Sequence, residues 1–415
     1  MLLFIATGIH LSVRGKFFQI TKCKDVFKHF IKSLTKKNNA DSISQFSTFC
    51  SVLGACIGTG NIVGVATAIS SGGPGVVFWM ILSAILSMAI AYTENYLGAE
   101  YTVKYGYDKK TIGAFAYIEK GLKMKKTSKA YALFCLASVF GMGNVTQSNS
   151  IAEALNISFG VPLLMTGLIL CTVTFIAIKG GIKRIARLQT FLVPAATIFF
   201  LFISLWVITV HKANVLSAIK LIIAQAFTTK AVRGFNIYTA LRYGVARGVF
   251  SNEAGLGSST ILHAQAQATT GKTQGVSAMV EVFVDTIFMC TITALVIISS
   301  TDFHTSNLFG VSLSLAAYST IGKIGEYGIS ILTVVFSFTS LVSCSFYGKK
   351  SLQYLFGNKG ARIYIIVYII IALLGCINPP KIIWALADIC NGLMAIPNLF
   401  AINILSKEVD YSVRT

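Results

Sequence analysis

A glycine-rich stretch interrupts what would otherwise be a continuous hydrophobic span. The run from Phe46 to Ile69 is long enough to cross a bilayer, yet it contains Gly54-Ala-Cys-Ile-Gly58-Thr-Gly60-Asn61-Ile-Val-Gly64, a poor sequence for an unbroken helix. In lipid, a broken helix is tolerated only where protein surrounds it and it lines a cavity. The carbonyls freed at such a break suit a cation, and the freed N–H groups suit a carboxylate. The stretch therefore predicts a shared site for a cation and an organic anion.

The alternative interpretation of the glycines is close helix packing. Gly54 and Gly58 form one pair of small residues four apart, and Gly60 and Gly64 form another. Asn61 favours the binding site, because an Asn in the middle of a membrane costs free energy unless it binds something.

Composition makes this an integral membrane protein. Of its 415 residues, 54% are hydrophobic and only 12% are charged, which indicates many membrane helices and no separate water-soluble domain. The net charge of +20 could suggest a nucleic-acid partner, but the basic residues gather beside apolar spans. They therefore indicate cytoplasmic loops that attract anionic lipid headgroups, with no nucleic-acid partner.

Ten hydrophobic runs of about membrane-spanning length follow a partial first helix. If the segment before the first full span is cytoplasmic, 27 Lys and Arg residues lie in inside loops and five in outside loops. The expected spans are Phe46–Ile69, Val76–Leu97, Lys129–Ala154, Phe159–Ile178, Leu188–Val210, Arg233–Ala268, Val276–Ser300, Ile324–Tyr347, Arg362–Ile377 and Ile382–Leu405.

A second glycine-bearing break falls in the sixth span. The segment from Ser251 to Gly257 follows a moderately apolar stretch and precedes a short polar helix expected from Ser258 to Ala268. Since the two breaks are five spans apart, their helices cross in opposite directions, which predicts an inverted-repeat transporter. We expect repeats at residues 46–210 and 231–405, a partial N-terminal helix and basic segment at 1–45, and a cytoplasmic tail at 406–415.

Arrangements typical of enzymes are missing from the sequence. The five histidines are scattered, no HExxH, GxSxG or phosphate-binding GxxxxGK[ST] pattern occurs, and the nine cysteines show no metal-ligand spacing. The sequence therefore predicts neither an enzymatic reaction nor a cofactor.

Polar residues inside the third span are candidates for binding. Asn144 and Gln147 are expected on one helix face, where uncharged amides suit an ammonium group or a zwitterion. Interhelical hydrogen bonding is the alternative, and it is about as good an explanation for Asn149 and Glu153.

The charged residues of the second half favour structural or gating roles. Glu253 is expected to cap the second half-helix or to pair with Arg247 or Arg242. Glu281, Asp285 and Asp388 could relay protons, but pairing with a neighbouring helix is the default expectation. In the eighth span, hydroxyl groups including those of Thr339 and Ser340 suit Na⁺, although such residues are also common in helix packing. Phe250 is a candidate apolar wall.

Several long motifs, in order along the chain, resemble the sodium:alanine symporter family, also called alanine or glycine:cation symporters. They are Gly58-Thr-Gly-Asn-Ile-Val-Gly-Val-Ala-Thr-Ala-Ile69, Gly72-Gly-Pro-Gly-Val-Val-Phe-Trp-Met80, Arg247-Gly-Val-Phe-Ser-Asn-Glu-Ala-Gly-Leu-Gly-Ser258, His263, Gln274-Gly, Asp285-Thr286 and Met394-Ala-Ile-Pro-Asn398.

The resemblance implies an all-α leucine-transporter-type fold of two five-helix inverted repeats with an extra N-terminal helix, here partial. It also implies Na⁺-driven uptake of alanine or glycine across the cytoplasmic membrane of a prokaryote, with H⁺ as the alternative ion. Where this family tends to have Trp, the chain has Cys344, which would widen the pocket.

The resemblance also implies roles for particular residues. Thr59 and Gly60 would bind the substrate carboxylate, Gln147 the amino group, and Phe250 would close the pocket. Asn61 would hold the break or bind a second ion. The Na⁺ ligands would be Gly54, Ile57, Thr339 and Ser340.

The first hypothesis is therefore a secondary active symporter for a small neutral amino acid, working by alternating access. A channel-like pore is less favoured because no ring of repeated charges is present. A degenerate transporter that acts as a sensor is suggested only by the short N-terminus.

Overall fold

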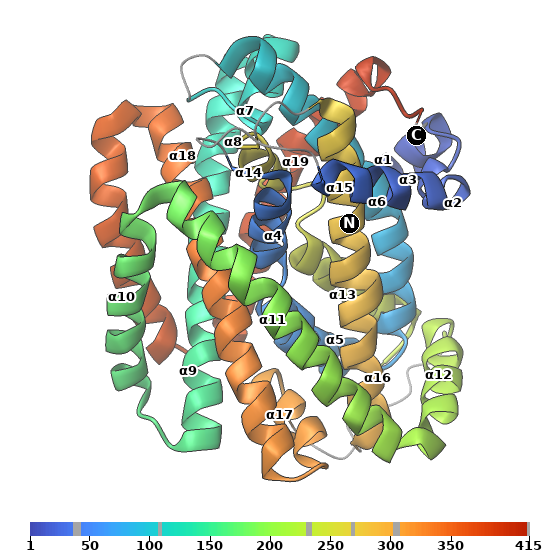
Figure 1. Cartoon of the computed structure of the whole chain (residues 1–415). Helices are drawn as coiled ribbons and strands as arrows, with labels where there is room; N and C mark the ends of the chain where they lie inside the picture. The colour runs from blue at the N-terminus through green and yellow to red at the C-terminus, as the bar shows by residue number, and fades with distance from the viewer. Residues whose placement is uncertain (36–42, 107–109, 230–234, 267–269, 302–307, 413–415) are drawn as a thin grey trace.

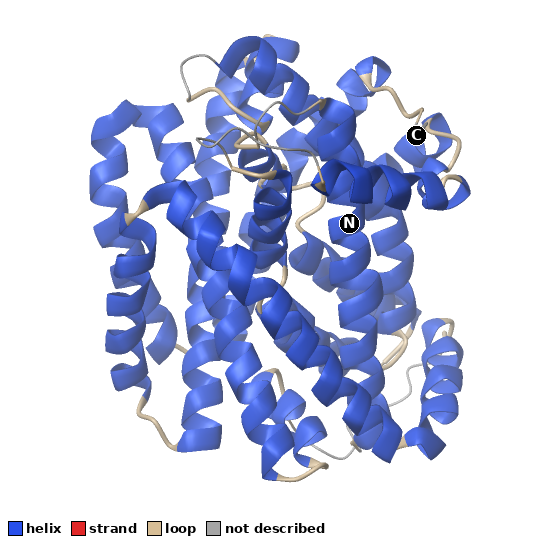
Figure 2. Ribbon diagram, in the orientation of Figure 1, coloured by secondary structure: helices blue, strands red, loops and turns tan. Residues whose placement is uncertain are grey.

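The computed structural model describes residues 1–35, 43–106, 110–229, 235–266, 270–301 and 308–412. Within them the chain folds into a bundle of helices joined by loops, and no strand is drawn (Figures 1 and 2). The expected start of the sixth span, Arg233, and its expected end, Ala268, lie outside the described residues.

Three helices precede the first expected span. α1 packs against α6 and α19, and α3 packs against α15 and α4. Apolar residues bury one face of α3, while Lys24, Lys28 and Lys32 are exposed on the other. These helices are α1 (Leu2–Arg14), α2 (Phe18–Thr21) and α3 (Cys23–Leu34).

The first expected repeat begins with the bent helix pair around Gly58 and ends with a long helix that crosses the bundle diagonally in Figure 1. Its elements are α4 (Gln45–Cys56), η1 (Gly60–Gly64), α5 (Val65–Gly72), α6 (Val76–Tyr105), α7 (Ala114–Ala116), η3 (Tyr117–Gly121), α8 (Lys125–Phe140), η4 (Gly141–Val145), α9 (Thr146–Phe159), α10 (Leu163–Lys179) and α11 (Gly181–Val210).

The second expected repeat follows a connecting helix, α12 (Lys212–Ala226). It contains α13 (Ile237–Asn252), α14 (Ser259–His263), α15 (Gly271–Val282), η5 (Phe283–Cys290), α16 (Thr291–Ser300), α17 (Val311–Ser319), α18 (Lys323–Ile377) and α19 (Pro380–Leu405). The 3₁₀ turn η6 (Ser406–Glu408) begins the expected C-terminal tail.

One expected boundary was wrong. The short helix after the second break is α14, which ends at His263 instead of reaching Ala268. The expected eighth and ninth spans lie on either side of a break within α18, where the chain bends at Gly357, whose φ of 70° is accessible to glycine without strain. Three π-helical turns, η1, η4 and η5, also interrupt the expected α-helical spans.

The helices have the length and surface of membrane spans. In the described part of the chain, five helices are long and apolar enough to cross a membrane, and the pair 45–56 and 60–72 makes a sixth, bent span. Large apolar side chains on the outer faces of α10 and α11 are exposed, as in Phe191 at 75%. An exposed apolar face of this kind suits lipid and not water. The segments with basic clusters lie toward the upper end in Figure 1, which the expected topology makes cytoplasmic.

Candidate functional site

The first break is present where the glycines predicted it. Helix α4 ends at Cys56, Ile57 has a non-helical ψ of 91°, and the two halves of the span meet at an angle of 44°. The N–H of Gly58 donates to Oδ1 of Asn61 at 3.2 Å, and the N–H of Thr59 donates to Oε1 of Gln147 at 3.1 Å. Because these two N–H groups bind side chains, the carbonyls four residues earlier lose their usual helical partners.

The predicted substrate residues are partly brought together. Thr59 and Gly60 are fully buried at the break, and the hydroxyl of Thr59 has no hydrogen-bond partner. Gln147 reaches them from α9, as the contact with Thr59 shows. Asn144 is directed elsewhere, because its Nδ2 donates to the carbonyl of Tyr368 on α18 at 2.7 Å. The role of Asn144 in substrate binding stays a prediction.

Phe250 lies on the other side of the break. It is buried near the end of α13, and its ring centroid lies 4.7 Å from that of Trp384 on α19. The backbone of α13 comes close to the first break, since a Cβ at Gly60 would lie 3.1 Å from Cα of Ser251. The two broken helices therefore meet at their interruptions.

Four of the predicted cation ligands lie where α4 meets α18. The hydroxyl of Ser340 donates to the carbonyl of Ala55 at 2.8 Å, which places α18 against the end of α4. Thr339 is the preceding residue, and its hydroxyl donates to the carbonyl of Phe336 at 2.8 Å. Gly54 and Ile57 lie on the facing segment. Neutral oxygens of this kind suit a hard cation. Among the described residues, no three His, Cys, Asp or Glu side chains gather to hold a metal ion.

Asn61 faces a different neighbour. Its Nδ2 donates to Oδ1 of Asp285 at 2.7 Å and to the Asp285 carbonyl at 3.0 Å, while its Oδ1 accepts from Gly58. The second oxygen of Asp285 accepts from the hydroxyl of Thr286 at 2.7 Å. In this structure Asn61 therefore holds the break and fastens it to η5, one of the two roles expected for it.

The second break is built around a buried carboxyl group. Glu253 ends α13 with a φ of 55°, and its side chain accepts a hydrogen bond from the hydroxyl of Ser258. A second buried carboxyl group, Glu94 of α6, accepts from the N–H of Gly255 and from Nδ2 of Asn398. These bonds hold the loop between α13 and α14.

Pairing with Arg247, one of the three alternatives expected for Glu253, is not what the structure shows. Arg247 instead donates to both oxygens of Asp388 on α19, at 2.6 and 3.0 Å. The reason is direction: Arg247 lies a turn before the break and points across to α19, whereas Glu253 lies within the break. The guanidinium of Arg247 also lies 4.5 Å above the ring of Trp384, so it makes a cation–π contact as well.

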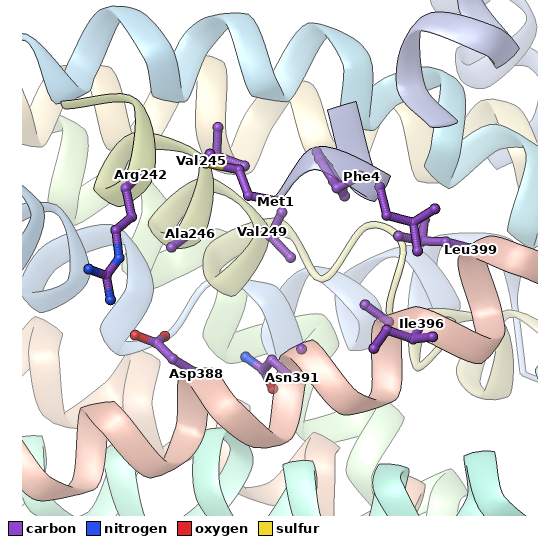
Figure 3. A pocket seen from close by; sticks show the side chains of 13 residues that line it. Met1, Phe4, Arg242, Val245, Ala246, Val249, Asp388, Asn391, Ile396 and Leu399 are labelled. Carbon is purple, nitrogen blue, oxygen red and sulfur yellow. The ribbon is translucent and has the colours of Figure 1, made fainter. Parts of the chain in front are cut away.

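Asp388 borders a cavity of about 290 Å³ between α1, α13 and α19. Figure 3 shows its carboxylate directed from α19 toward α13, with Arg242 on the opposite wall. The Asp388 side chain is 37% exposed, whereas that of Arg247 is 6% exposed. The ion pair is therefore accessible from the cavity on the side of Asp388 and buried on the side of Phe250.

Sequence reasoning missed two residues at the site. The ring of Trp384 packs at a tilt against that of Phe250, and Gln189 of α11 reaches α18 through hydrogen bonds to the Thr339 carbonyl and Ser343. An amide near the start of an apolar span was a signal for Gln189. The sequence held no comparable signal for Trp384, because aromatic residues are common in membrane helices.

Comparison with known proteins agrees with this geometry. The model of the sodium:alanine symporter family matches residues 1–415. The chain belongs to this family. Members are symporters, so the chain is a cation-coupled amino-acid transporter of the membrane and not an enzyme.

Relatives in this family align over almost the whole chain. The sodium/alanine symporter AgcS of Methanococcus maripaludis is 37% identical over 99% of this chain and 92% of its own. A probable sodium/glutamine symporter, GlnT of Bacillus subtilis, is 34% identical over 99% of this chain and 86% of its own.

Solved structures show that this family member has the leucine-transporter-type fold. MhsT in complex with L-phenylalanine matches with a TM-score of 0.64 at 13% identity, over 89% of this chain and 90% of its own. A substrate-bound, outward-open Na⁺-coupled sialic acid symporter matches with a TM-score of 0.59 at 13% identity, over 99% and 98%.

Proposed function

We propose that this protein couples the entry of Na⁺ to the uptake of a small neutral amino acid, alanine or glycine, by alternating access. One observation carries the proposal: the N–H of Thr59 is held by the amide oxygen of Gln147, beside a Thr59 hydroxyl with no partner. The Thr59 N–H and the Gln147 amide oxygen therefore satisfy each other's hydrogen-bonding capacity at the break.

A zwitterionic amino acid can replace both sides of that contact. Its carboxylate would accept from the N–H and hydroxyl of Thr59 and from the N–H of Gly60, at the positive end of the second half-helix. Its ammonium group would donate to Oε1 of Gln147, which then loses no hydrogen bond. Phe250 would cover the small side chain. Asn144 would line the same space after a change of side-chain conformation.

The coupling cation would bind on the other face of the same break. Carbonyls of Gly54 and Ile57, together with the hydroxyls of Thr339 and Ser340, would surround Na⁺. Because one interruption supplies groups to both ligands, binding the cation would order the backbone that holds the substrate, and each ligand would favour the binding of the other.

Alternating access would arise from movement between two inverted repeats, residues 46–210 and 231–405, around this site. In the expected topology, Arg247 and Asp388 lie on the outer side of Phe250, so their ion pair and the contact between the Phe250 and Trp384 rings would form the outer gate. Glu253 and Asp285 would hold the two broken helices in register. We place the protein in the cytoplasmic membrane of a prokaryote, with residues 1–45 and 406–415 on the cytoplasmic side and lipid around the bundle.

Uptake into proteoliposomes tests the coupling. Labelled alanine should accumulate against its gradient when Na⁺ is high outside, and this accumulation should stop when K⁺ replaces Na⁺. Accumulation that ignores the Na⁺ gradient would reject Na⁺ coupling.

The substrate range is tested by competition among glycine, L-alanine, D-alanine, serine and glutamine. Cys344 matters here, because its Sγ lies 3.9 Å from both Ser340 Oγ and Glu253 Oε1, next to the predicted ligands. A small residue at this position favours a pocket that also accepts a larger side chain. If only glycine and alanine compete, the pocket is no wider than that of an alanine carrier.

Coupling to H⁺ is the second candidate. Glu94 and Glu253 are both buried beside the second break, and neither forms an ion pair among the described residues. A buried carboxyl group without a cation can bind a proton. Accumulation driven by an imposed pH gradient in the absence of Na⁺ would favour this candidate over Na⁺ coupling.

A further inference from the structure

Gln189 reaches from α11 into the space between α4 and α18. Its side chain is 1% exposed, and its Nε2 donates to the carbonyl of Thr339 at 2.8 Å and to the hydroxyl oxygen of Ser343 at 2.9 Å. We propose that the amide oxygen of Gln189 is a further ligand of the coupling cation. The proposal rests on the proposed function, because it adds a ligand to the Na⁺ site described there.

The hydrogen bonds fix which way the amide points. The Thr339 carbonyl can only accept, so the nitrogen of Gln189 must face it. The hydroxyl of Ser343 donates its own proton to the carbonyl of Ser51 at 3.1 Å, so its oxygen is also an acceptor toward Gln189. Exchanging the oxygen and nitrogen of Gln189 would place two acceptors together twice. The amide oxygen therefore faces away from α18.

That oxygen is buried and has no hydrogen-bond partner. A buried polar atom without a partner is costly, and the great majority of buried polar atoms in folded proteins are hydrogen-bonded. If Gln189 served only to connect α11 to α18, the hydrogen bonds of its nitrogen would be enough. Burial of the oxygen without a partner would then only cost free energy.

The orphaned oxygen points at Gly54, one of the predicted ligands. A Cβ at Gly54 would lie 2.3 Å from Oε1 of Gln189, so only glycine leaves room for the amide at this place. The carbonyl of Gly54 is also free of its usual helical partner, because the Gly58 N–H donates to Asn61. The unpartnered amide oxygen thus lies against the end of α4 at Gly54, and the next residue, Ala55, accepts from Ser340 of α18.

This arrangement suits a cation bound by neutral oxygens. Carbonyls at the end of a half-helix coordinate Na⁺ in transporters with broken helices, and a side-chain amide oxygen is an equivalent ligand. Gln189 would also link cation binding to α11, the last helix of the first expected repeat, which the other predicted ligands do not reach.

Binding of ²²Na⁺ to the purified full-length protein tests the proposal without transport. Gln189→Met keeps the length of the side chain but removes the oxygen, so the Kd for Na⁺ should rise about tenfold or more. The affinity for labelled alanine at saturating Na⁺ should stay within about twofold, which confirms the fold. Thr190→Val is the matched control, because its hydroxyl also faces α4 from α11, through Ser47, and it should leave Na⁺ binding unchanged.

Gln189→Glu distinguishes a cation ligand from a residue that only connects α11 to α18. It also replaces the Met variant as the test if that variant does not fold. Its protonated carboxyl group keeps an oxygen toward Gly54 and an O–H that can donate to the Thr339 carbonyl, so Na⁺ should bind, and more tightly at pH 8.5 than at pH 6 as the carboxyl group ionises. Unchanged Na⁺ affinity in Gln189→Met, or an affinity in Gln189→Glu that is independent of pH, would overturn the proposal while leaving Na⁺ coupling intact. Absence of Na⁺ binding in the unmodified protein would instead reject the proposed function, and this inference with it.

Discussion

The guanidinium of Arg247 makes two hydrogen bonds to the carboxylate of Asp388, linking α13 to α19 beside the contacting rings of Phe250 and Trp384. Paired forks of this kind are among the strongest ion pairs in proteins. Arg247 is almost fully buried, so it depends on Asp388 for its charge partner. This relationship joins the second broken helix to the last span at the place where we propose the outer gate.

Replacing Asp388 by Ala should therefore disable transport. The loss leaves a buried guanidinium unpaired, so we expect alanine uptake to fall by about tenfold or more, and Asp388→Glu to restore part of it. Lys323→Gln is the control, because it breaks an exposed pair with Glu326. Normal uptake in Asp388→Ala would show that the ion pair has no part in gating.

Replacing Thr59 by Val and Gln147 by Leu together should abolish substrate binding with the fold intact. The double variant removes the free hydroxyl and the acceptor that faces the Thr59 N–H, which are the proposed contacts for both charged ends of the amino acid. We expect the Kd for alanine to rise by more than about a hundredfold in an equilibrium binding assay.

Thr172→Val provides its comparison, since that hydroxyl bonds only to the Leu168 carbonyl on the exposed side of α10. If the double variant binds alanine as the unmodified protein does, the site is elsewhere.

Gly58→Ala should block transport through a close contact at the break. Its Cβ would lie 2.8 Å from Cβ of Ser340 and 2.9 Å from Oε1 of Gln147, so both side chains would have to shift away from the site. We expect uptake to fall by about tenfold or more. The matched change, Gly392→Ala on α19, meets no atom within 4 Å and should leave uptake unchanged. Equal activity of the two variants would contradict the packing described here.

The C-terminal segment should show a pH-dependent attachment. Hydrogen bonds from the Ser412 hydroxyl, from Lys272 at 2.9 Å and from the Ser412 N–H at 2.8 Å lower the pKa of Asp410 to about 2 from its usual 3.8. A lowered pKa means that the contacts stabilise the folded state above about pH 4 and are lost as the pH falls toward 2. Because the Asp410 side chain is half exposed, we expect a contribution below about 1 kcal/mol.

Asp410→Asn should reproduce the acid effect at pH 7. Backbone hydrogen exchange of residues 409–412, corrected for its intrinsic pH dependence, should increase about threefold in this variant, while Glu326→Gln leaves it unchanged. An exchange rate for Asp410→Asn equal to that of the unmodified protein would show that the tail is held by other contacts, such as the hydroxyl of Tyr92 on the Asp410 carbonyl.

The residues that predicted the fold best were those that disfavour a continuous helix within an apolar run. Glycines and an Asn in an apolar run located the first break, and Gln147, which the resemblance assigned to the substrate amino group, contacts it. Contacts between distant helices were harder to predict from the sequence. Arg247 pairs with Asp388 and not with Glu253, and the contact of Gln189 with α18 was missed. Residue spacing within one span does not show which residue of another span lies opposite. The eighth and ninth expected spans lie on either side of the bend at Gly357.

The three π-helical turns beside the site have a geometric consequence. A π-helical turn contains one residue more than an α-helical turn, so the helix after it is rotated by about 100° relative to an uninterrupted α-helix. This explains why Asn144, within η4, and Gln147, just after it, bind different neighbours although a helical wheel places them on one face. In alignments of related chains, we therefore expect single-residue gaps at Gly60–Gly64, Gly141–Val145 and Phe283–Cys290. Deleting one residue there would convert the π-helical turn to a regular α-helical turn and leave both flanking helices intact.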